Sequence, residues 1–209
     1  MKVIKIDLDN FSKEDIEGIA EEIRKEKVVV LPTDTIYGLS AIATSKKAIR
    51  KIYRIKKRKP EQQKHLILLM KSFCMVRRYC FLSKRQYDHL KGRWTERERA
   101  LTVILRGRRD YFQKQGVNLF ELISDDDGVA VRRPNNKFLL ELLKKVDEPI
   151  VSTSLNITGQ SDLKDIYQIE KYFKDAKPDI VIDAGKLPKQ KPSRLEDLRD
   201  INKIKVHRK

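Results

Sequence analysis

The chain has 209 residues and a formal net charge of +17, because 47 lysines and arginines face 30 aspartates and glutamates. Hydrophobic residues make up 40% of the chain, which is enough for a packed core and excludes an intrinsically disordered protein. No apolar run approaches the roughly 20 residues of a membrane span, and the first residues lack the apolar stretch of a secretion signal. We therefore expect one domain over residues 1–209, without a membrane segment, in the cytoplasm.

The two cysteines, Cys74 and Cys80, have no second cysteine or histidine at metal-ligand spacing. A zinc site is therefore not predicted, and the thiols are interpreted as ordinary buried or bystander groups.

The first sixty residues alternate short apolar strands with amphipathic helices. Val3–Asp7 alternates as an edge strand does, and Ser12 begins a capping box for the helix that follows. That helix carries its apolar residues on one face, at Ile16, Ile19, Ala20 and Ile23. Val28–Leu31 predicts a strand that Pro32 ends, and Ser45 is the expected cap of a second helix. The apolar stripe of the second helix is Ala48, Ile49, Ile52 and Tyr53.

The remaining chain continues the alternation less regularly. Apolar runs predict strands at Leu66–Met70, Leu101–Leu105, Val129–Val131, Ile150–Ser152, Ile180–Ile182 and Lys203–Val206. Helical patterns occupy Lys84–Leu90, Asn136–Lys145 and Asp165–Phe173, and Lys186–Ser193 is expected to be a loop. The spacing between Met70 and Val129 does not fit repeated βαβ units. The sequence therefore predicts the α/β class, with a single-domain twisted mixed β-sheet and flanking helices rather than a Rossmann fold.

Sequence signatures of common nucleotide and hydrolase sites are absent, but three polar clusters follow strands. A Walker loop, a dinucleotide fingerprint and a hydrolase elbow all fail to match. The first cluster, Pro32–Leu39, concentrates two hydroxyls, a carboxylate and a phenol directly after a strand. It is either part of a ligand site or an ordinary Asx/ST turn in which Thr33 and Asp34 bond the local backbone and Tyr37 packs in the core.

The second cluster, Lys46–Lys59, holds nine basic residues and no acidic one. Lys56 extends the buried stripe of the helix, so Lys56 and Arg58 are expected to emerge near the sheet, where they could hold phosphate oxygens. For most of the nine residues the alternative, a solvated basic helix face, is preferred.

The third cluster, Val151–Gly159, supplies four hydroxyls and an amide directly after a strand. This neutral hydrogen-bonding surface suits an anionic or zwitterionic ligand, although an ordinary Ser/Thr-rich loop would read the same way.

Taken together, the three clusters resemble the YrdC-type threonylcarbamoyl-AMP synthases. The family's P-T-[DE]-T-x-Y-G-L stands in full at Pro32–Leu39, and its K-x-R follows at Lys56–Arg58. Further matches are V-A-V-R at Val129–Arg132, S-x-N at Ser154–Asn156, D-x-G at Asp183–Gly185 and P-S at Pro192–Ser193. The resemblance covers about residues 15 to 208.

The sequence also departs from the family pattern in four places. Leu155 replaces an alanine in S-A-N, and Arg194 replaces the threonine in P-S-T. The loop Lys59–Leu66 is longer and lacks the usual Pro-Leu, and Trp94–Ala100 lacks the Pro-Gly-Pro that follows the tryptophan. These departures leave two alternatives open. One is a non-catalytic RNA-binding member of the fold, and the other is a YciO-like enzyme acting on threonylcarbamoyl-AMP or modified tRNA.

The resemblance implies a nucleotidyltransferase that converts L-threonine, bicarbonate and ATP into threonylcarbamoyl-AMP and pyrophosphate for tRNA modification. It assigns threonine to Thr35, Arg132 and Ser152, and makes Lys56 and Arg58 the catalytic cations. It assigns ATP to Lys56, Arg58, Lys64, Ser154, Asn156, Ser161, Ser193 and Arg208. Mg²⁺ is expected to enter with ATP rather than in a protein-built metal site.

The strong positive charge suggests a polyanionic partner. The segment Lys84–Arg109 contains nine basic and three acidic residues, with Tyr87 and Trp94 among them, which would attract nucleic acid in a salt-dependent way. The family's concave surface is generally basic, so the resemblance implies contact with tRNA or double-stranded RNA, and a tRNA threonylcarbamoyl transferase as protein partner. The alternative is that the charge reflects solubility or a general lysine bias.

Overall fold

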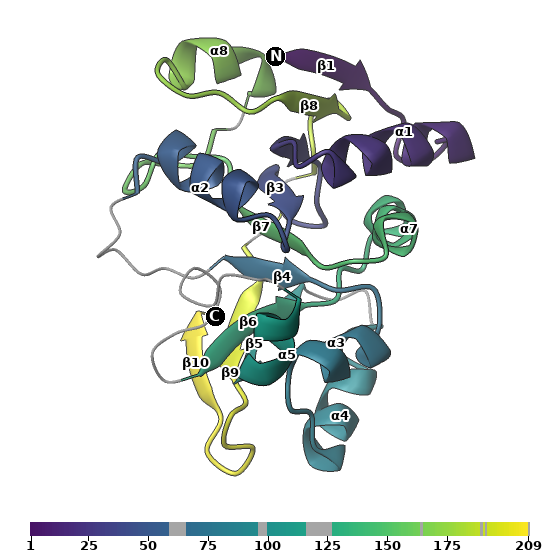
Figure 1. The fold of residues 1–209 in the computed structure, drawn as a ribbon, viewed down its shortest axis with the longest axis vertical. Helices are drawn as coiled ribbons and strands as arrows, with labels where there is room; N and C mark the ends of the chain where they lie inside the picture. The colour runs from purple at the N-terminus through teal and green to yellow at the C-terminus, as the bar shows by residue number, and fades with distance from the viewer. Residues whose placement is uncertain are drawn as a thin grey trace.

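The structure, a computed structural model, describes residues 1–58, 66–95, 100–115, 127–163, 165–188, 190 and 192–208. Within these residues, ten strands form one sheet in the order β1-β8-β2-β3-β7-β4-β6-β5-β9-β10 (Figure 1). Their bounds are β1 Lys2–Lys5, β2 Val29–Leu31, β3 Gly38–Ile42, β4 Ile67–Leu69, β5 Leu101–Arg106, β6 Gly128–Arg132, β7 Ile150–Ser154, β8 Ile180–Asp183, β9 Arg194–Asp197 and β10 Lys205–Arg208. Parallel and antiparallel pairs are mixed along the sheet, so the predicted mixed α/β sheet is confirmed.

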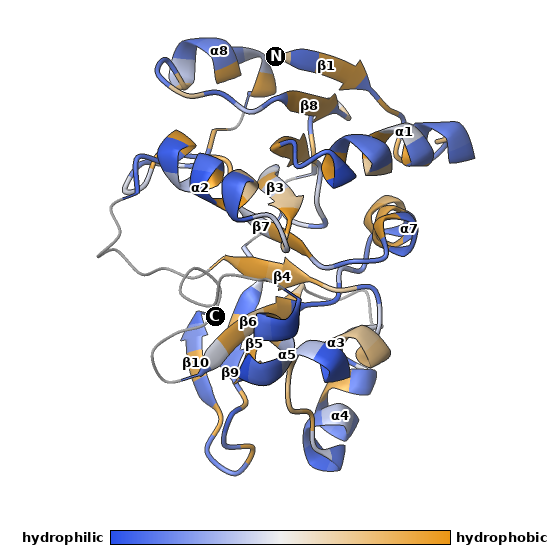
Figure 2. Cartoon of the chain, viewed as in Figure 1, coloured by the Kyte–Doolittle hydropathy of each residue, from blue (hydrophilic) through white to orange (hydrophobic). Residues whose placement is uncertain are grey.

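Helices cover both faces of this sheet and divide the core in two (Figure 1). Their bounds are α1 Lys13–Arg24, α2 Lys46–Ile55, α3 Phe73–Tyr79, α4 Lys84–Lys91, α5 Arg109–Lys114, α7 Lys137–Val146, the 3₁₀ turn η1 Ile166–Gln168 and α8 Ile169–Tyr172. Buried residues of α1 and α7 form one apolar cluster with one face of the sheet, and those of α2 to α5 and α8 form the other. Figure 2 shows the result, with apolar central strands and helices whose outer faces are polar.

The first two helices begin where their caps predict. The Ser12 hydroxyl accepts a hydrogen bond from the Asp15 amide at 3.0 Å, and the Asp15 carboxylate accepts one from the Ser12 amide at 2.9 Å. The Ser45 hydroxyl accepts from the Ala48 amide at 3.1 Å. The predicted apolar faces are buried, except that Tyr53 is only half-buried while Ile55 completes the stripe of α2.

Ser12→Ala is expected to lower the free energy of unfolding by about 1 kcal/mol, because the substitution removes one half of the capping box. Urea denaturation measures the change. Ser161→Ala, at an exposed position outside the helices, is the control and is expected to stay within about 0.5 kcal/mol of the parent. Equal midpoints for all three proteins would show that the capping box adds nothing to stability.

Several elements were not predicted or are displaced. Strands β3 and β9 and helices α3 and α5 have no counterpart among the predictions, and the last strand begins at Lys205, two residues later than predicted. The helix predicted over Asp165–Phe173 is divided into η1 and α8. The segment of β3 contains glycine and serine and is buried on both faces, so it shows neither strand propensity nor alternation.

Strand β3 is central to the arrangement of the site. It pairs with β2 on one side and with β7 on the other, with Ser40 opposite Ser152 and Gly38 opposite Ser154. The polar clusters that follow β2 and end β7 are thereby brought side by side, although more than a hundred residues separate them in sequence. Among the described helices, none is both long and apolar enough to cross a membrane.

Candidate active site

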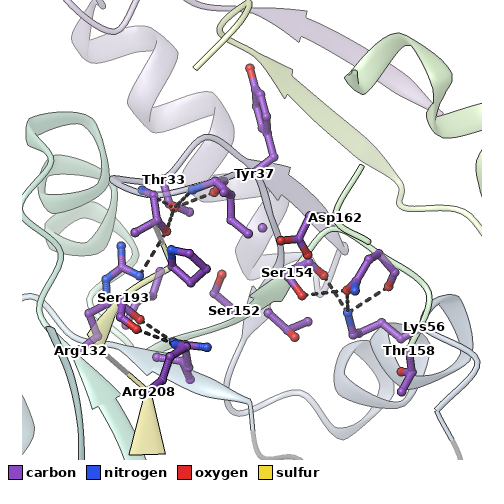
Figure 3. A pocket seen from close by; sticks show the side chains of 18 of the residues that line it. Thr33, Tyr37, Lys56, Arg132, Ser152, Ser154, Thr158, Asp162, Ser193 and Arg208 are labelled. Atoms are coloured by element: carbon purple, nitrogen blue, oxygen red, sulfur yellow. Dashed lines mark hydrogen bonds between the residues drawn. The ribbon is translucent and has the colours of Figure 1, made fainter. Parts of the chain in front are cut away.

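A pocket of about 370 Å³ collects the three polar clusters of the sequence. Figure 3 shows two groups of side chains around it, with Ser152 between them. Thr33, Arg132, Ser193 and Arg208 lie on one side, and Lys56, Ser154, Thr158 and Asp162 lie on the other. Among the described lining residues, four are cations, Lys56, Arg58, Arg132 and Arg208, and one, Asp162, is a carboxylate. Such a lining attracts a ligand that carries several negative charges.

Lys56 joins the end of α2 to the turn after β7. Its side chain is buried, and its ammonium donates to Ser154 O at 2.7 Å, Asn156 O at 2.9 Å and Asn156 Oδ1 at 2.6 Å. The Thr158 amide donates in return to Lys56 O at 2.9 Å. These bonds fix the S-x-N segment against the K-x-R segment, as the resemblance requires of one shared site.

The electrostatic environment of Lys56 weakens its hold on its proton. Burial and then the neighbouring Arg58 charge lower the pKa of Lys56 to about 7, while the Asp162 carboxylate opposes that change. Burial also lowers the pKa of Arg58 below the usual arginine value. Two cations held this close to one another gain stability from an anion placed between them.

The turn between β2 and β3 is both a structural turn and a wall of the pocket. The Thr33 hydroxyl accepts from the Thr35 amide at 3.1 Å and donates to Ile36 O at 2.6 Å. The Tyr37 hydroxyl donates to Gly185 O at 2.7 Å and accepts from the Ala184 amide at 3.0 Å. The ST-turn interpretation and the site interpretation therefore hold together, since Thr33, Thr35 and Tyr37 also line the pocket.

Arg132, at the end of β6, is a buried cation aimed at the same turn. Its guanidinium forms an ion pair with Asp34, and its Nη1 lies 3.5 Å from the Thr35 hydroxyl. Burial, with a contribution from the Arg208 charge, lowers the pKa of Arg132 to about 10, so it stays charged at neutral pH. Its Nε has no hydrogen-bond partner within the described part of the chain. A buried donor left in this state can bind the carboxylate of a ligand in the pocket.

The C-terminal strand closes one side of the pocket. Arg208 of β10 donates from Nε to Ser193 O at 2.7 Å and from Nη2 to the Ser193 hydroxyl at 2.9 Å. The buried Thr102 hydroxyl lies 2.8 Å from the same serine oxygen. Ser193 and Arg208 are thus placed in the site, far from the other motifs in sequence.

The structure brings nine of the predicted site residues together. Those that line the pocket are Thr35, Lys56, Arg58, Arg132, Ser152, Ser154, Asn156, Ser193 and Arg208. Ser161 is exposed and does not line it, so its place in the ATP site stays a prediction, and Lys64 lies outside the described residues. Thr158, the last hydroxyl of the Val151–Gly159 cluster, also lines the pocket. Asp162 lines it too but lies beyond that cluster, where no motif indicates its role.

Two side chains that differ from the family pattern, Leu155 and Arg194, lie outside the pocket. Leu155 is fully buried in the apolar core beneath the turn. Arg194 donates from Nε to Glu196 at 2.6 Å and does not line the pocket. Neither substitution changes the polar surface that a ligand would meet.

The aromatic rings of the basic segment Lys84–Arg109 are less available for stacking on nucleic-acid bases than the composition suggests. Trp94 is buried, and its indole donates to Leu101 O at 3.1 Å. Tyr87 contacts Phe73 edge-on and lies under Arg77. Both rings are used in packing, so any polyanion at this surface would contact its cations rather than stack on Trp94.

Metal-ligand side chains do not gather among the residues that the structure describes. Within the described ranges, no three His, Cys, Asp or Glu side chains lie close enough to hold a metal ion. Both cysteines carry thiols, with Cys74 exposed and Cys80 buried, and burial raises the pKa of Cys80 above its usual value.

Comparisons with known proteins find relatives that match most of the chain. A protein of Methanocaldococcus jannaschii, to which threonylcarbamoyl-AMP synthase activity is provisionally attributed, is 31% identical over 198 residues, 93% of this chain and 85% of that one. The threonylcarbamoyl-AMP synthase of Actinobacillus pleuropneumoniae is 27% identical over 183 residues, 88% of this chain and 94% of that one.

Solved structures share the fold over nearly the whole chain. YciO of E. coli superposes with a TM-score of 0.81 at 26% identity, covering 100% of this chain and 94% of that one. Sua5 of P. abyssi, solved in complex with L-threonine, gives a TM-score of 0.79 at 26% identity, covering 96% of this chain and 55% of that one. The Sua5/YciO/YrdC family model, described as telomere recombination, matches residues 21–209. The chain with this pocket therefore belongs to the Sua5/YciO/YrdC family.

Proposed function

We propose that the protein is an L-threonylcarbamoyladenylate synthase, which forms threonylcarbamoyl-AMP and pyrophosphate from L-threonine, bicarbonate and ATP. The observation that carries the proposal is a single pocket with a cation at each end, Lys56 on one side and the buried Arg132 on the other. A triphosphate and an amino-acid carboxylate each need such a partner. The relatives named threonylcarbamoyl-AMP synthase and the threonine-bound Sua5 structure support the same assignment.

The proposed reaction has two steps. The threonine amine attacks bicarbonate, and loss of water gives an N-carboxylate. An oxygen of this carbamate then attacks the α-phosphate of ATP, and pyrophosphate leaves. Such a reaction depends on orienting three substrates and neutralising phosphate charge, and it needs no nucleophilic side chain of the protein.

Each group of pocket residues has a proposed part in this reaction. Arg132, Thr35 and Ser152 bind threonine, with the guanidinium of Arg132 on the carboxylate. The nucleotide and its phosphates are held by Lys56, Arg58, Ser154, Asn156, Ser193 and Arg208. Mg²⁺ is expected to arrive with ATP, where it would help to neutralise phosphate charge. A reaction that consumes ATP and serves tRNA is expected in the cytoplasm.

The proposal is tested by pyrophosphate release from Mg–ATP, with threonine and bicarbonate omitted in turn. Release that requires both substrates is expected. Release that ignores threonine, or no release from folded protein, would contradict the synthase.

A YciO-like activity is the second candidate, because the similarity to E. coli YciO extends over the whole chain. It predicts no synthesis but consumption of threonylcarbamoyl-AMP or modified tRNA. The orientations of Leu155 and Arg194 give no support to the third reading, a fold that has lost catalysis, since neither side chain lines the pocket.

The proposed RNA partner is tRNA or double-stranded RNA, and the proposed protein partner is a tRNA threonylcarbamoyl transferase. The net charge of +17 supports an RNA partner, and its contribution should fall as salt rises. A tRNA titration from 50 to about 300 mM salt is expected to show steep weakening. Affinity independent of salt would contradict a phosphate-backbone interaction.

ATP binding is expected to weaken as pH rises above about 7. The ammonium of Lys56, whose pKa burial lowers to about 7, is charged below that pH and loses its charge above it, so the attraction for phosphates is strongest on the acid side. Calorimetric titration with Mg–ATP between pH 6.5 and 9, without threonine and bicarbonate, measures the trend. Lys56→Arg keeps its charge across this range and should give a flatter profile, whereas equal profiles for both proteins would exclude Lys56 as the titrating group.

A further inference from the structure

Ser40 is a buried hydroxyl with no part in the proposed reaction. It lies in β3 and has no exposed surface. The register places it between Val29 of β2 and Ser152 of β7, and Ile67 of β4 lies beyond Ser152. Of these four residues, which lie side by side on neighbouring strands, the outer two are therefore apolar and only the two serines are polar. Ser40 cannot touch a ligand directly, but its neighbour Ser152 lines the pocket.

Packing alone does not explain a serine at this position. A buried hydroxyl without a hydrogen bond costs about 1–3 kcal/mol, and the strand positions beside Ser40 in the row and along β3 accept Val29 and Ile42. The Ser40 hydroxyl offsets this cost with its single proton, which faces the Ser152 oxygen at 3.2 Å and, more distantly, Gly38 O at 3.4 Å.

The direction of this bond decides what Ser152 offers to a ligand. Each serine hydroxyl has one proton and two acceptor lone pairs. When Ser40 donates to Ser152, one lone pair of Ser152 is occupied and its own proton remains for the pocket. Ser152 then presents a donor, which is what the carboxylate or carbamate oxygen of a threonine-derived ligand requires.

Gly38 provides the space for this arrangement. A Cβ added at Gly38 would lie 2.6 Å from the Ser152 hydroxyl oxygen and 3.3 Å from Thr153 O. The first distance is far inside van der Waals contact, so the Ser152 hydroxyl would have to rotate away. Glycine is needed here for the room it leaves beside Ser152.

We propose that Ser40 and Gly38 are positioning residues that hold the Ser152 hydroxyl as a hydrogen-bond donor to the threonine substrate. The inference rests on the proposed synthase function. It adds Ser40, which does not line the pocket, and Gly38, which lines it beside Ser152, as residues that determine how well Ser152 binds the substrate.

The first test is a double-mutant cycle between positions 40 and 152. Ser40→Ala is expected to raise the threonine KM about 3- to 10-fold, as loss of roughly one hydrogen bond does, with the KM for ATP unchanged. In the Ser152→Ala background the same change should have no further effect. If Ser40→Ala raised the threonine KM equally in the parent and in the Ser152→Ala protein, or raised the KM values of both threonine and ATP, Ser40 would serve packing alone.

Two further variants separate hydroxyl donation from volume. Ser40→Thr keeps the hydroxyl and is expected to retain the threonine KM more closely than Ser40→Cys, which keeps the volume but is a weak donor. Thr44→Ala, which removes a hydroxyl bonded to Glu148 just beyond the end of β3, is the control and should leave both KM values unchanged. Rescue by cysteine but not by threonine would overturn the proposal.

Gly38→Ala gives an independent test. It is expected to raise the threonine KM at least as much as Ser152→Ala does. In the Ser152→Ala background the clash with the hydroxyl is gone, so Gly38→Ala should add little to the threonine KM. A full penalty in that background would remove Gly38 from this role. An inactive parent protein that binds no threonine would reject the synthase itself, whereas an active parent with unchanged variants would reject only this inference.

Discussion

Lys56→Met is expected to lower pyrophosphate release about 100-fold or more, which is the usual cost of losing one charged group that stabilises a transition state. The substitution keeps an unbranched apolar stem in the buried position and removes the ammonium. Ser154 O, Asn156 O and Asn156 Oδ1 would lose their common donor, so the S-x-N segment would be less well held as phosphate attraction is lost. Arg58→Ala is expected to act in the same direction.

Lys57→Met is the matched control for Lys56→Met. Lys57 is the next residue, but its ammonium pairs with Asp175 at 2.6 Å on the exposed surface, where an ion pair contributes little. The rate of pyrophosphate release by the Lys57→Met protein is expected to stay within about twofold of the parent rate. Circular dichroism and thermal melts check that both variants fold. A folded Lys56→Met protein with the parent rate would remove Lys56 from the mechanism.

Arg132→Lys is expected to raise the KM for threonine about 10- to 100-fold while the KM for ATP changes little. Lysine keeps the positive charge beside Asp34 but cannot present two parallel donors to a carboxylate. Loss of a charge-assisted hydrogen bond of about 1.5–3 kcal/mol accounts for the range. Steady-state kinetics with each substrate varied in turn separates the two KM values.

The conservative variant Arg132→Lys separates an effect on threonine binding from an effect on folding. Arg132→Ala would leave the Asp34 carboxylate, which is nearly buried, without its ion pair, and such an uncompensated charge costs about 3–5 kcal/mol. Loss of activity in that variant would report folding as much as binding. Arg133→Lys is the control, since Arg133 bonds Trp94 O at 3.0 Å and does not line the pocket. Equal changes in both KM values for Arg132→Lys would contradict a specific role in threonine binding.

The sequence predicted those elements in which local signals agreed. A capping box and an apolar face both indicated α1, and the helix begins at the predicted cap, Ser12, with that face buried. Strand β3 lacked such signals, because a strand covered on both faces shows no alternation. Strand β9 carries Arg194 and Glu196, and charged residues in a sequence usually indicate an exposed segment. In the structure these two side chains form an ion pair with one another.

The sequence indicated which residues line the pocket but not where their side chains point. The order of the motifs identified nine of the lining residues, since each motif stands at the end of a strand or helix that the sheet brings to one place. The direction of each side chain depends on strand register and on turns. The resemblance names Ser161, which is exposed and outside the pocket lining, whereas its neighbour Asp162 lines the pocket. The contact between Ser40 and Ser152 likewise depends on the pairing of β3 with β7.

The most direct test of the proposed function is the mass of the nucleotide product formed from ATP, threonine and ¹³C-labelled bicarbonate. A synthase should form an adenylate that carries both the threonine mass and one labelled carbon, with pyrophosphate released in equal amount. AMP alone, or an adenylate of threonine without the label, would contradict it, because the carbamate step would then play no part in the reaction.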